Sequence, residues 1–294
     1  MSAHPLIIVD SGFGGFSLVA HLEAELEPGA GLELVYVNAA PSHALGYNQM
    51  SGPRQREATL ANVLQAVEAR LDPAAIVLAS HTLSTIFMGL AADARPSRPV
   101  ETLLDDTLAL IEAAHSEDPQ RLIAVFGTPT TAGDQRLREP ARARGVPPER
   151  MVYQACPGLE RTISNDPSGD EVLARLRVHR DQLCARLGHT PRQLALLLGC
   201  THYAYRPELF IAAFAELRVE VAPLDPGRAL ARRLLVSHAR VGGAGLSISM
   251  LSRYRPPARD LSTVSALLDR TAPHAAAAVR ECRWVPELFE LADA

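Results

Sequence analysis

The chain has 294 residues, of which 47% are hydrophobic, so it is long enough for two domains of ordinary size or one large one. A net charge of −4 leaves no basic field for nucleic acid, and the absence of an apolar run of about 18 residues argues against a membrane span. The four cysteines are too widely spaced for a disulfide framework or a zinc site. A reducing cytoplasm is therefore the expected location.

The basic residues are all arginine; the sequence contains no lysine. A Schiff base to pyridoxal phosphate or to a carbonyl substrate requires a lysine amine. This composition therefore excludes pyridoxal-dependent amino-acid chemistry and directs attention to side chains that act without that cofactor.

Short apolar runs alternate with helical patterns in the first third of the chain. Asp10 and Ser11 follow the first run and lead into a glycine loop that lacks the spacing of a phosphate-binding motif. We interpret them as polar groups facing a cleft; a helix cap and a turn are the alternative. Strands are predicted at 6–10, 32–38 and 75–79, and helices at 16–26 and 55–71.

The remainder repeats this pattern after a proline-bearing linker at 95–99. Strands are predicted at 122–126, 151–155, 194–199 and 219–224, and helices up to about residue 115, at 171–187, after Tyr203 and at 228–238. Cys184 falls on the apolar stripe of its helix and is predicted to belong to the core. Residues 241–245 are expected to be flexible, and the C-terminal part is ambiguous apart from a helix near 275–279.

The alternation of strands and helices predicts an α/β fold with parallel sheets. Strands end in polar residues at Asp10, Ser80, Thr128 and Cys200, with a helix expected after each. Two similar α/β halves would explain this repetition. Thr128 and Thr131 could cap the following helix or bind a carboxylate, and capping alone is favoured for at least one of them.

Cys200 stands after five apolar residues and Gly199, where a buried parallel strand ends. Ligands of open α/β sheets bind beyond the carboxyl ends of the strands. A helix starting after Cys200 would favour the thiolate through its positive end. We therefore interpret Cys200 as a working base or acid; for an isolated cysteine a small apolar packing residue would be the better interpretation.

These residues resemble the aspartate/glutamate racemase family over almost the whole chain. The strongest likeness is the run from Gly199 to Tyr203, which matches the family's second cysteine motif. Asp10-Ser11-Gly12 with Gly14-Gly15 matches the opening motif. Smaller landmarks are Ala155-Cys156-Pro157, Leu224-Asp225 and the threonines at 128 and 131.

The resemblance implies two doubly wound parallel-sheet domains in a pseudo-symmetric arrangement with the site between them. The first domain would take residues 1–98 and 222–294, and the second, inserted domain residues 99–221. It also implies proton transfer at the Cα of glutamate or aspartate without a cofactor or metal, in the supply of cell-wall precursors. The implied partners are an amino-acid or other small carboxylate substrate and, as one option, a second copy in a homodimer, with no nucleic acid or membrane.

By the same resemblance, Asp10 assists the first catalytic position and His202 assists Cys200. Substrate-binding residues would be Ser11, Gly46, His81, Thr82, Thr128, Thr131 and Thr201.

The chain departs from the family's pattern at the first catalytic position. Where the family has Ala-Cys-Asn-Thr, this sequence has Ala79-Ser80-His81-Thr82, and the family's Tyr-Gly pair is Leu45-Gly46. The family's glutamate after the Ala-Cys-Pro landmark corresponds to Ser164. A serine hydroxyl is a far weaker acid than a thiol, so Ser80 needs activation to act as a base.

Three hypotheses remain open. The first is a racemase with Cys200 as the main base, in which Ser80, with water or His81, completes the second transfer slowly or asymmetrically. The second is a single-cysteine lyase, such as a decarboxylase of a substituted malonate, or an isomerase. The third is a protein that binds a ligand without turnover. A serine hydrolase is disfavoured because no G-x-S-x-G motif surrounds Ser80, and His81 with His202 lacks a recognised metal-ligand spacing.

Overall fold

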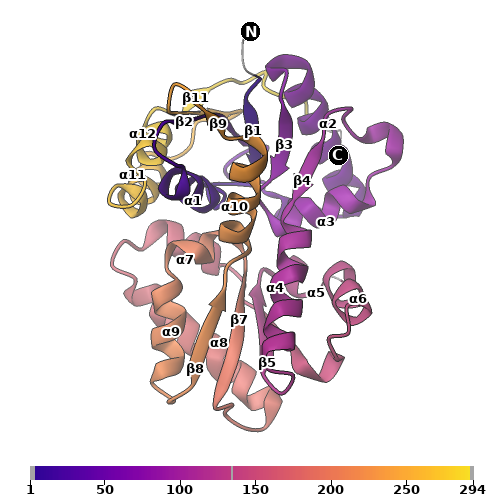
Figure 1. Ribbon diagram of the computed structural model, residues 1–294, viewed down its shortest axis with the longest axis vertical. Coiled ribbons are helices and arrows are strands. Elements are labelled where there is room, and N and C mark those ends of the chain that lie inside the picture. The colour runs from indigo at the N-terminus through magenta and orange to yellow at the C-terminus, as the bar shows by residue number, and fades with distance from the viewer. Residues whose placement is uncertain (1–3, 134, 292–294) are drawn as a thin grey trace. The chain divides into compact units, whose positions relative to one another are not determined.

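The computed structural model describes residues 4–133 and 135–291, which form two compact α/β units. Unit 1 comprises residues up to Leu103 together with those from Gly227 onward, and unit 2 comprises Leu104–Pro226. Each unit has its own sheet, shown in Figure 1. None of the described helices combines the length and apolar character that crossing a bilayer requires.

The sheet of unit 1 has the strand order β11-β10-β2-β1-β3-β4, with β9 paired to β2. Its strands are β1 (Leu6–Asp10), β2 (Ala30–Asn38), β3 (Ala75–Leu78), β4 (Val100–Thr102), β9 (Arg240–Val241), β10 (Leu246–Ser252) and β11 (Arg283–Trp284). All of these pairings are parallel except that of β9. The register aligns Asp10 with Asn38 and Asn38 with Ser252, so three polar side chains end neighbouring strands.

Helices cover both faces of this sheet (Figure 1). They are α1 (Phe16–Glu25), α2 (Pro53–Leu71), α3 (His81–Gly89), α10 (Pro226–His238), α11 (Ala258–Leu268) and α12 (Pro273–Arg280), with 3₁₀ turns η1 (Tyr47–Gln49) and η2 (Ala92–Ala94). Ile7 and Val9 pack with the apolar stripe of α2, whereas Ile8 points to the opposite face and is equally buried. Burial on both faces explains the continuous apolar run of β1.

Unit 2 repeats the central strand order of unit 1. Its sheet runs β6-β5-β7-β8, all parallel, which is the same succession as β2-β1-β3-β4. The strands are β5 (Leu122–Gly127), β6 (Met151–Ala155), β7 (Gln193–Gly199) and β8 (Glu220–Leu224). The helices are α4 (Leu103–Glu117), α5 (Pro129–Gly133), α6 (Gln135–Ala143), α7 (Leu159–Asn165), α8 (Asp170–Leu187) and α9 (Pro207–Ala215), with 3₁₀ turns η3 (Pro148–Arg150) and η4 (Thr201–Tyr205).

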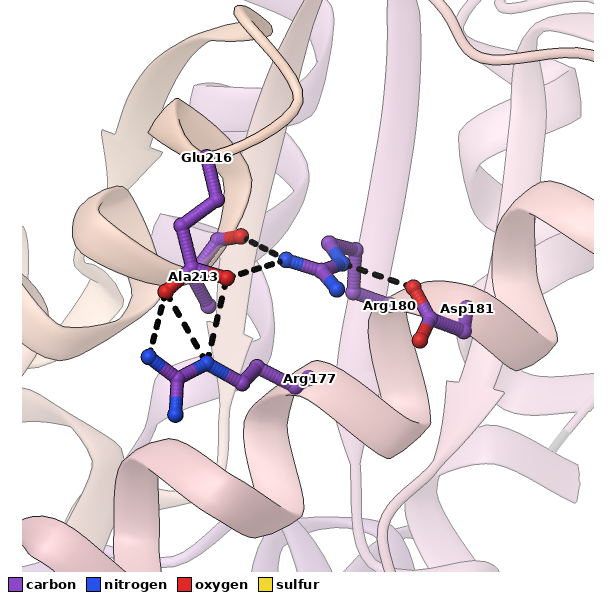
Figure 2. A network of polar contacts seen from close by, with 5 residues as sticks. All are labelled: Arg177, Arg180, Asp181, Ala213 and Glu216. Carbon is purple, nitrogen blue, oxygen red and sulfur yellow. Dashed lines mark hydrogen bonds and ion pairs between the residues drawn. The ribbon is translucent and has the colours of Figure 1, made fainter.

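A buried arginine ties α8 to α9 in unit 2, as Figure 2 shows. Arg180 is only 6% exposed, and its guanidinium donates to the backbone oxygen of Ala213 and to Glu216, 2.9 Å away. The Nε of Arg180 bonds to Asp181 at 2.8 Å, and Arg177 reaches the other oxygen of Glu216. This network satisfies a charge that would be costly to bury alone.

The predicted α/β class with two parallel sheets is confirmed. The domain limits lie a few residues later than expected. Residues 100–102 form β4 and pair with β3 of unit 1, and β8 pairs with β7 of unit 2.

Three segments differ from the sequence analysis or go beyond it. Residues 241–245 are not simply flexible, because β9 pairs with β2 and a Cβ at Gly31 would lie 2.7 Å from the Cα of Gly243. Cys184 is only partly buried and lies outside the described core clusters. The ambiguous C-terminal part contains β10 and α11, neither of which was predicted.

Candidate active site

Asp10 ends β1 in unit 1 and is buried, with 1% of its surface exposed. The backbone amide of Ser11 donates to its Oδ1 at 2.6 Å, and the amide of Gly15 donates to Oδ2. Burial raises the pKa of Asp10 to about 6, because desolvation outweighs the lowering by these amides and by the hydroxyls of Tyr36 and Ser11. Asp10 can therefore change its protonation state near neutral pH.

Gly15 is the residue that closes the loop onto Asp10. A Cβ at this position would lie 2.9 Å from both the Cβ and the Oδ2 of Asp10 and 3.1 Å from the Cβ of Ala79. The glycine loop therefore brings a backbone amide against the carboxylate of Asp10.

Ser80, His81 and Thr82 follow β3 and are all buried, at 6%, 4% and 5% exposure. Ser80 is the N-cap of α3, and its Oγ accepts from the amide of Leu83 at 3.5 Å. The backbone does turn here, since α3 begins at His81. Ser80 thus has a structural role that requires no catalysis, in addition to its place at a strand end.

Ser11 and Gly46 lie at the same carboxyl edge of the unit 1 sheet, Ser11 directly after β1 and Gly46 in the loop after β2. The amide of Gly46 donates to Oε1 of Gln49 at 3.1 Å, which closes the turn η1. Both residues are partly buried.

In unit 2, Thr128 and Thr131 lie together after β5 and are almost fully buried. The amide of Thr131 donates to the Oγ1 of Thr128 at 3.2 Å, and the two hydroxyl oxygens are 3.2 Å apart. Thr128 therefore occupies the helix-capping role that the sequence favoured for one of the pair.

Cys200 follows β7 in unit 2 and is 9% exposed. Its Sγ lies 3.8 Å from Nδ1 of His202, which is within reach of a weak hydrogen bond. Desolvation lowers the pKa of His202 to about 4, so the imidazole is neutral at pH 7. As a neutral ring, His202 can form a hydrogen bond with the sulfur of Cys200. A permanent thiolate–imidazolium ion pair is disfavoured, because it would require a protonated ring. Thr201 is also 9% exposed and opens the turn that carries the histidine.

The expected helix after Cys200 is absent at that point. Cys200 is followed by the five-residue 3₁₀ turn η4, and α9 begins only at Pro207. A single short turn aligns few peptide dipoles. The prediction that an α-helix directly after Cys200 stabilises its thiolate is therefore wrong. The Cys200 sulfur instead has His202 as a side-chain contact.

Ser80 and Cys200 occupy equivalent positions in the repeated topology. Each follows the strand that pairs beside the first strand of its sheet, β3 next to β1 and β7 next to β5. Their backbone angles nearly coincide, with φ −143° and ψ 130° for Ser80 and φ −139° and ψ 134° for Cys200. The internal repeat thus presents a hydroxyl in one unit where it presents a thiol in the other.

Residues that sequence reasoning did not single out also shape the unit 1 edge. Tyr36 on β2 donates a hydrogen bond at 2.9 Å to the backbone oxygen of Gly12 and lies 3.3 Å from Asp10. Asn38 donates to the hydroxyls of Ser252 and Tyr254 at 3.4 and 3.3 Å. The alternation of β2 places Tyr36 and Asn38 on one face, which was the available signal.

Known proteins resemble this chain in both sequence and fold. No family model matches the chain. A glutamate racemase of Pseudomonas putida (strain W619) is 28% identical over 235 residues, covering 78% of this chain and 80% of that protein.

Two crystal structures share the fold over 97% of this chain and 98% of theirs. Glutamate racemase isoform RacE1 of Bacillus anthracis has a TM-score of 0.68 at 15% identity. The glutamate racemase of Francisella tularensis in complex with D-glutamate has a TM-score of 0.67 at 17% identity.

The repeated α/β fold, the polar strand ends and these relatives place the protein among the amino-acid racemases, a class of isomerases. In sequence and in fold the chain is similar to the aspartate/glutamate racemase family.

Proposed function

We propose that this protein racemises glutamate or aspartate without a cofactor, with Cys200 as the main base and acid. The observation that carries this proposal is the Cys200–His202 contact of 3.8 Å at the end of β7. A thiol has a pKa of about 8.5 in water, close enough to neutral pH for modest stabilisation to yield reactive thiolate. The relatives named above act on glutamate or are named for it, which supports an acidic amino acid as the substrate.

The proposed step moves one proton at Cα. The Cys200 thiolate takes the proton and the electron pair of the C–H bond delocalises into the adjacent carboxylate. Return of a proton to the opposite face of the planar carbon gives the other enantiomer, and return to the same face gives back the starting one. Neutral His202 supports this cycle by accepting a hydrogen bond from the thiol or donating one to the thiolate.

Ser80 serves the second face of Cα in this proposal. Its position in the repeat equals that of Cys200, which supports the pairing of their roles. A hydroxyl can donate a proton to a carbanion, but it is a poor base when the reaction runs the other way. Racemisation is therefore expected to be slow and to favour the enantiomer whose Cα proton faces Cys200, with Asp10 or His81 assisting Ser80.

Binding of the substrate carboxylates falls to small polar groups in both units. Ser11, Thr82, Thr128, Thr131 and Thr201 supply hydroxyls at the carboxyl edges of the two sheets, where open α/β sheets bind ligands. Gly46 and His81 complete the proposed set. The hydroxyls and the imidazole fit a small dianionic substrate through hydrogen bonds, without a dedicated lysine.

A second candidate function is a single-cysteine lyase that decarboxylates a substituted malonate. The observation that favours it is the use of the Ser80 hydroxyl as a helix cap toward Leu83, because a capping oxygen needs no role in chemistry. Decarboxylation leaves a carbanion that needs one proton, and Cys200 alone can deliver it.

Exchange of the Cα proton in heavy water separates these functions. Purified protein is incubated with D- and L-glutamate and D- and L-aspartate, and deuterium incorporation is followed by mass spectrometry. Incorporation with at least one enantiomer supports the racemase. Carbon dioxide release from a malonate panel without exchange supports the lyase, and ligand binding without either supports a protein that does not turn its ligand over.

A further inference from the structure

The carboxylate of Asp10 receives two donors on each oxygen. Its Oδ1 accepts from the amide of Ser11 at 2.6 Å and from the Ser11 hydroxyl at 3.3 Å. Its Oδ2 accepts from the amide of Gly15 and lies 3.3 Å from the hydroxyl of Tyr36. A carboxylate offers about two lone-pair sites on each oxygen. A substrate ammonium or an acidic group that is to bond with Asp10 must therefore displace one of these donors.

The hydroxyls are the donors that can leave. The amides of Ser11 and Gly15 are fixed by the backbone of the loop, whereas an O–H bond rotates without moving any heavy atom. The Tyr36 oxygen also lies 2.9 Å from the backbone oxygen of Gly12, a shorter contact than its 3.3 Å approach to Asp10. One phenol proton can serve only one of these two acceptors fully, and turning between them exchanges one hydrogen bond for another.

The ring of Tyr36 is held in place while the proton turns. Tyr36 has no exposed surface, and Phe16 stacks on it with ring centroids 4.0 Å apart and an interplanar angle of 25°. The position of the oxygen is therefore fixed, and only the O–H direction remains variable. We propose that Tyr36 is a positioning residue whose hydroxyl proton alternates between Asp10 and the Gly12 carbonyl, freeing one lone pair of Asp10 when substrate binds.

This inference deepens the proposed function and rests on it, because it gives Asp10 a part in the reaction. In the free protein the phenol lies within hydrogen-bond distance of both acceptors, and its bond to Asp10 favours the ionised carboxylate. In the substrate complex the phenol donates to Gly12, and Asp10 bonds to the newly arrived donor.

Other buried polar groups lie on the strands and helices of the same unit. They are Asn38 on β2, Ser80 after β3, Ser17 on α1 and Ser252 on β10, which carry no ionisable group near neutral pH, and His81 at the start of α3, which carries an imidazole. The pH dependence of the rate alone could therefore not separate Asp10 from His81. For this reason the ionisation of the Asp10 carboxyl has to be measured directly.

The test is Tyr36→Phe, which keeps the ring and removes the hydroxyl. Carbon-13 NMR of protein labelled at aspartate carboxyls, with Asp10→Asn to assign the signal, gives the pKa of Asp10 directly. We expect it to rise by about one pH unit in Tyr36→Phe, the size associated with one hydrogen bond to a charged group. The acidic limb of the pH profile of kcat/KM, which reports the free enzyme, should move to higher pH by the same amount. The acidic limb of the pH profile of kcat, which reports the substrate complex, should not move.

Phe16→Leu is the matched control, because it loosens the packing of the Tyr36 ring and leaves the hydroxyl. It should lower stability without moving the Asp10 titration. An Asp10 pKa unchanged in Tyr36→Phe overturns the inference whether or not the protein racemises any amino acid. An equal shift of the acidic limbs of kcat and kcat/KM also overturns it, because Tyr36 would then donate to Asp10 both before and after substrate binds. Absence of racemisation in the wild type with a shifted Asp10 titration would count against the proposed function instead.

Discussion

Replacing Gly15 by alanine tests how tightly the opening loop is built around Asp10. The added Cβ would lie 2.9 Å from the Cβ and Oδ2 of Asp10 and 3.1 Å from the Cβ of Ala79, all shorter than ordinary contact. Since Asp10 and Ala79 are buried, the carboxylate or the loop must shift. Overpacking costs about 1–3 kcal/mol, and a lost hydrogen bond to a charged group costs about 1.5–3 kcal/mol. We therefore expect Gly15→Ala to lower the free energy of unfolding by about 2.5–6 kcal/mol.

Urea unfolding followed by circular dichroism measures this loss. Gly52→Ala is the matched control, because Gly52 lies in the same unit, has extended backbone and would place its Cβ in open space. Because Gly52 is the N-cap of α2, where glycine is preferred to alanine, this change should cost no more than about 1 kcal/mol. Gly15→Ala should also abolish most Cα exchange, since its amide can no longer reach Asp10. Equal unfolding free energies for Gly15→Ala and Gly52→Ala would refute the reasoning.

Three further predictions concern other parts of the molecule. Hydrogen bonds from Arg177 and Arg180 lower the pKa of Glu216 to about 2, so its contribution to stability is present above pH 4.5 and is lost as the pH falls toward 2. Glu216→Gln should therefore show a shallower loss of stability over that range in acid-unfolding curves; identical curves would contradict it. The pKa of His202 is lowered to about 4, so its contribution is present above the unfolded value of 6.5 and is lost as the pH falls from there toward 4. NMR should show its ring neutral at pH 5.5, whereas an imidazolium at that pH would contradict the lowered pKa. Ser80→Cys should raise the rate of glutamate racemisation and reduce the difference between the two directions. If neither Ser80→Cys nor its combination with His81→Asn changes the rate, the protein acts on a different substrate.

The buried strands of the fold were predictable because parallel strands covered on both faces form continuous apolar runs. β1 and β7 were found in this way, with their polar ends at Asp10 and Cys200. β10 was missed because serines alternate with its apolar residues and a glycine-rich turn precedes it. α11 follows two prolines, and its apolar positions Leu261, Val264 and Leu268 were the periodic signal that could have revealed it.

The local parts of the site were predictable and its three-dimensional parts were not. A thiol and a hydroxyl at strand ends can be read from short runs of sequence, as Cys200 and Ser80 show. The contact between Tyr36 and Asp10 joins residues 26 positions apart and depends on the register of β1 with β2. The low pKa of His202 depends on burial, which its neighbours in sequence do not determine.

The most direct test of the central claim compares Cys200→Ala with Cys184→Ala in the rate of Cα deuterium exchange. Cys184 is a partly buried thiol on α8, outside the strand edges that carry the proposed site, so its loss controls for the removal of a sulfur atom. We predict that Cys200→Ala loses at least about 1000-fold of the exchange rate with the preferred enantiomer, in line with removal of an essential general base, while Cys184→Ala keeps the wild-type rate. Exchange at the wild-type rate in Cys200→Ala would contradict the account.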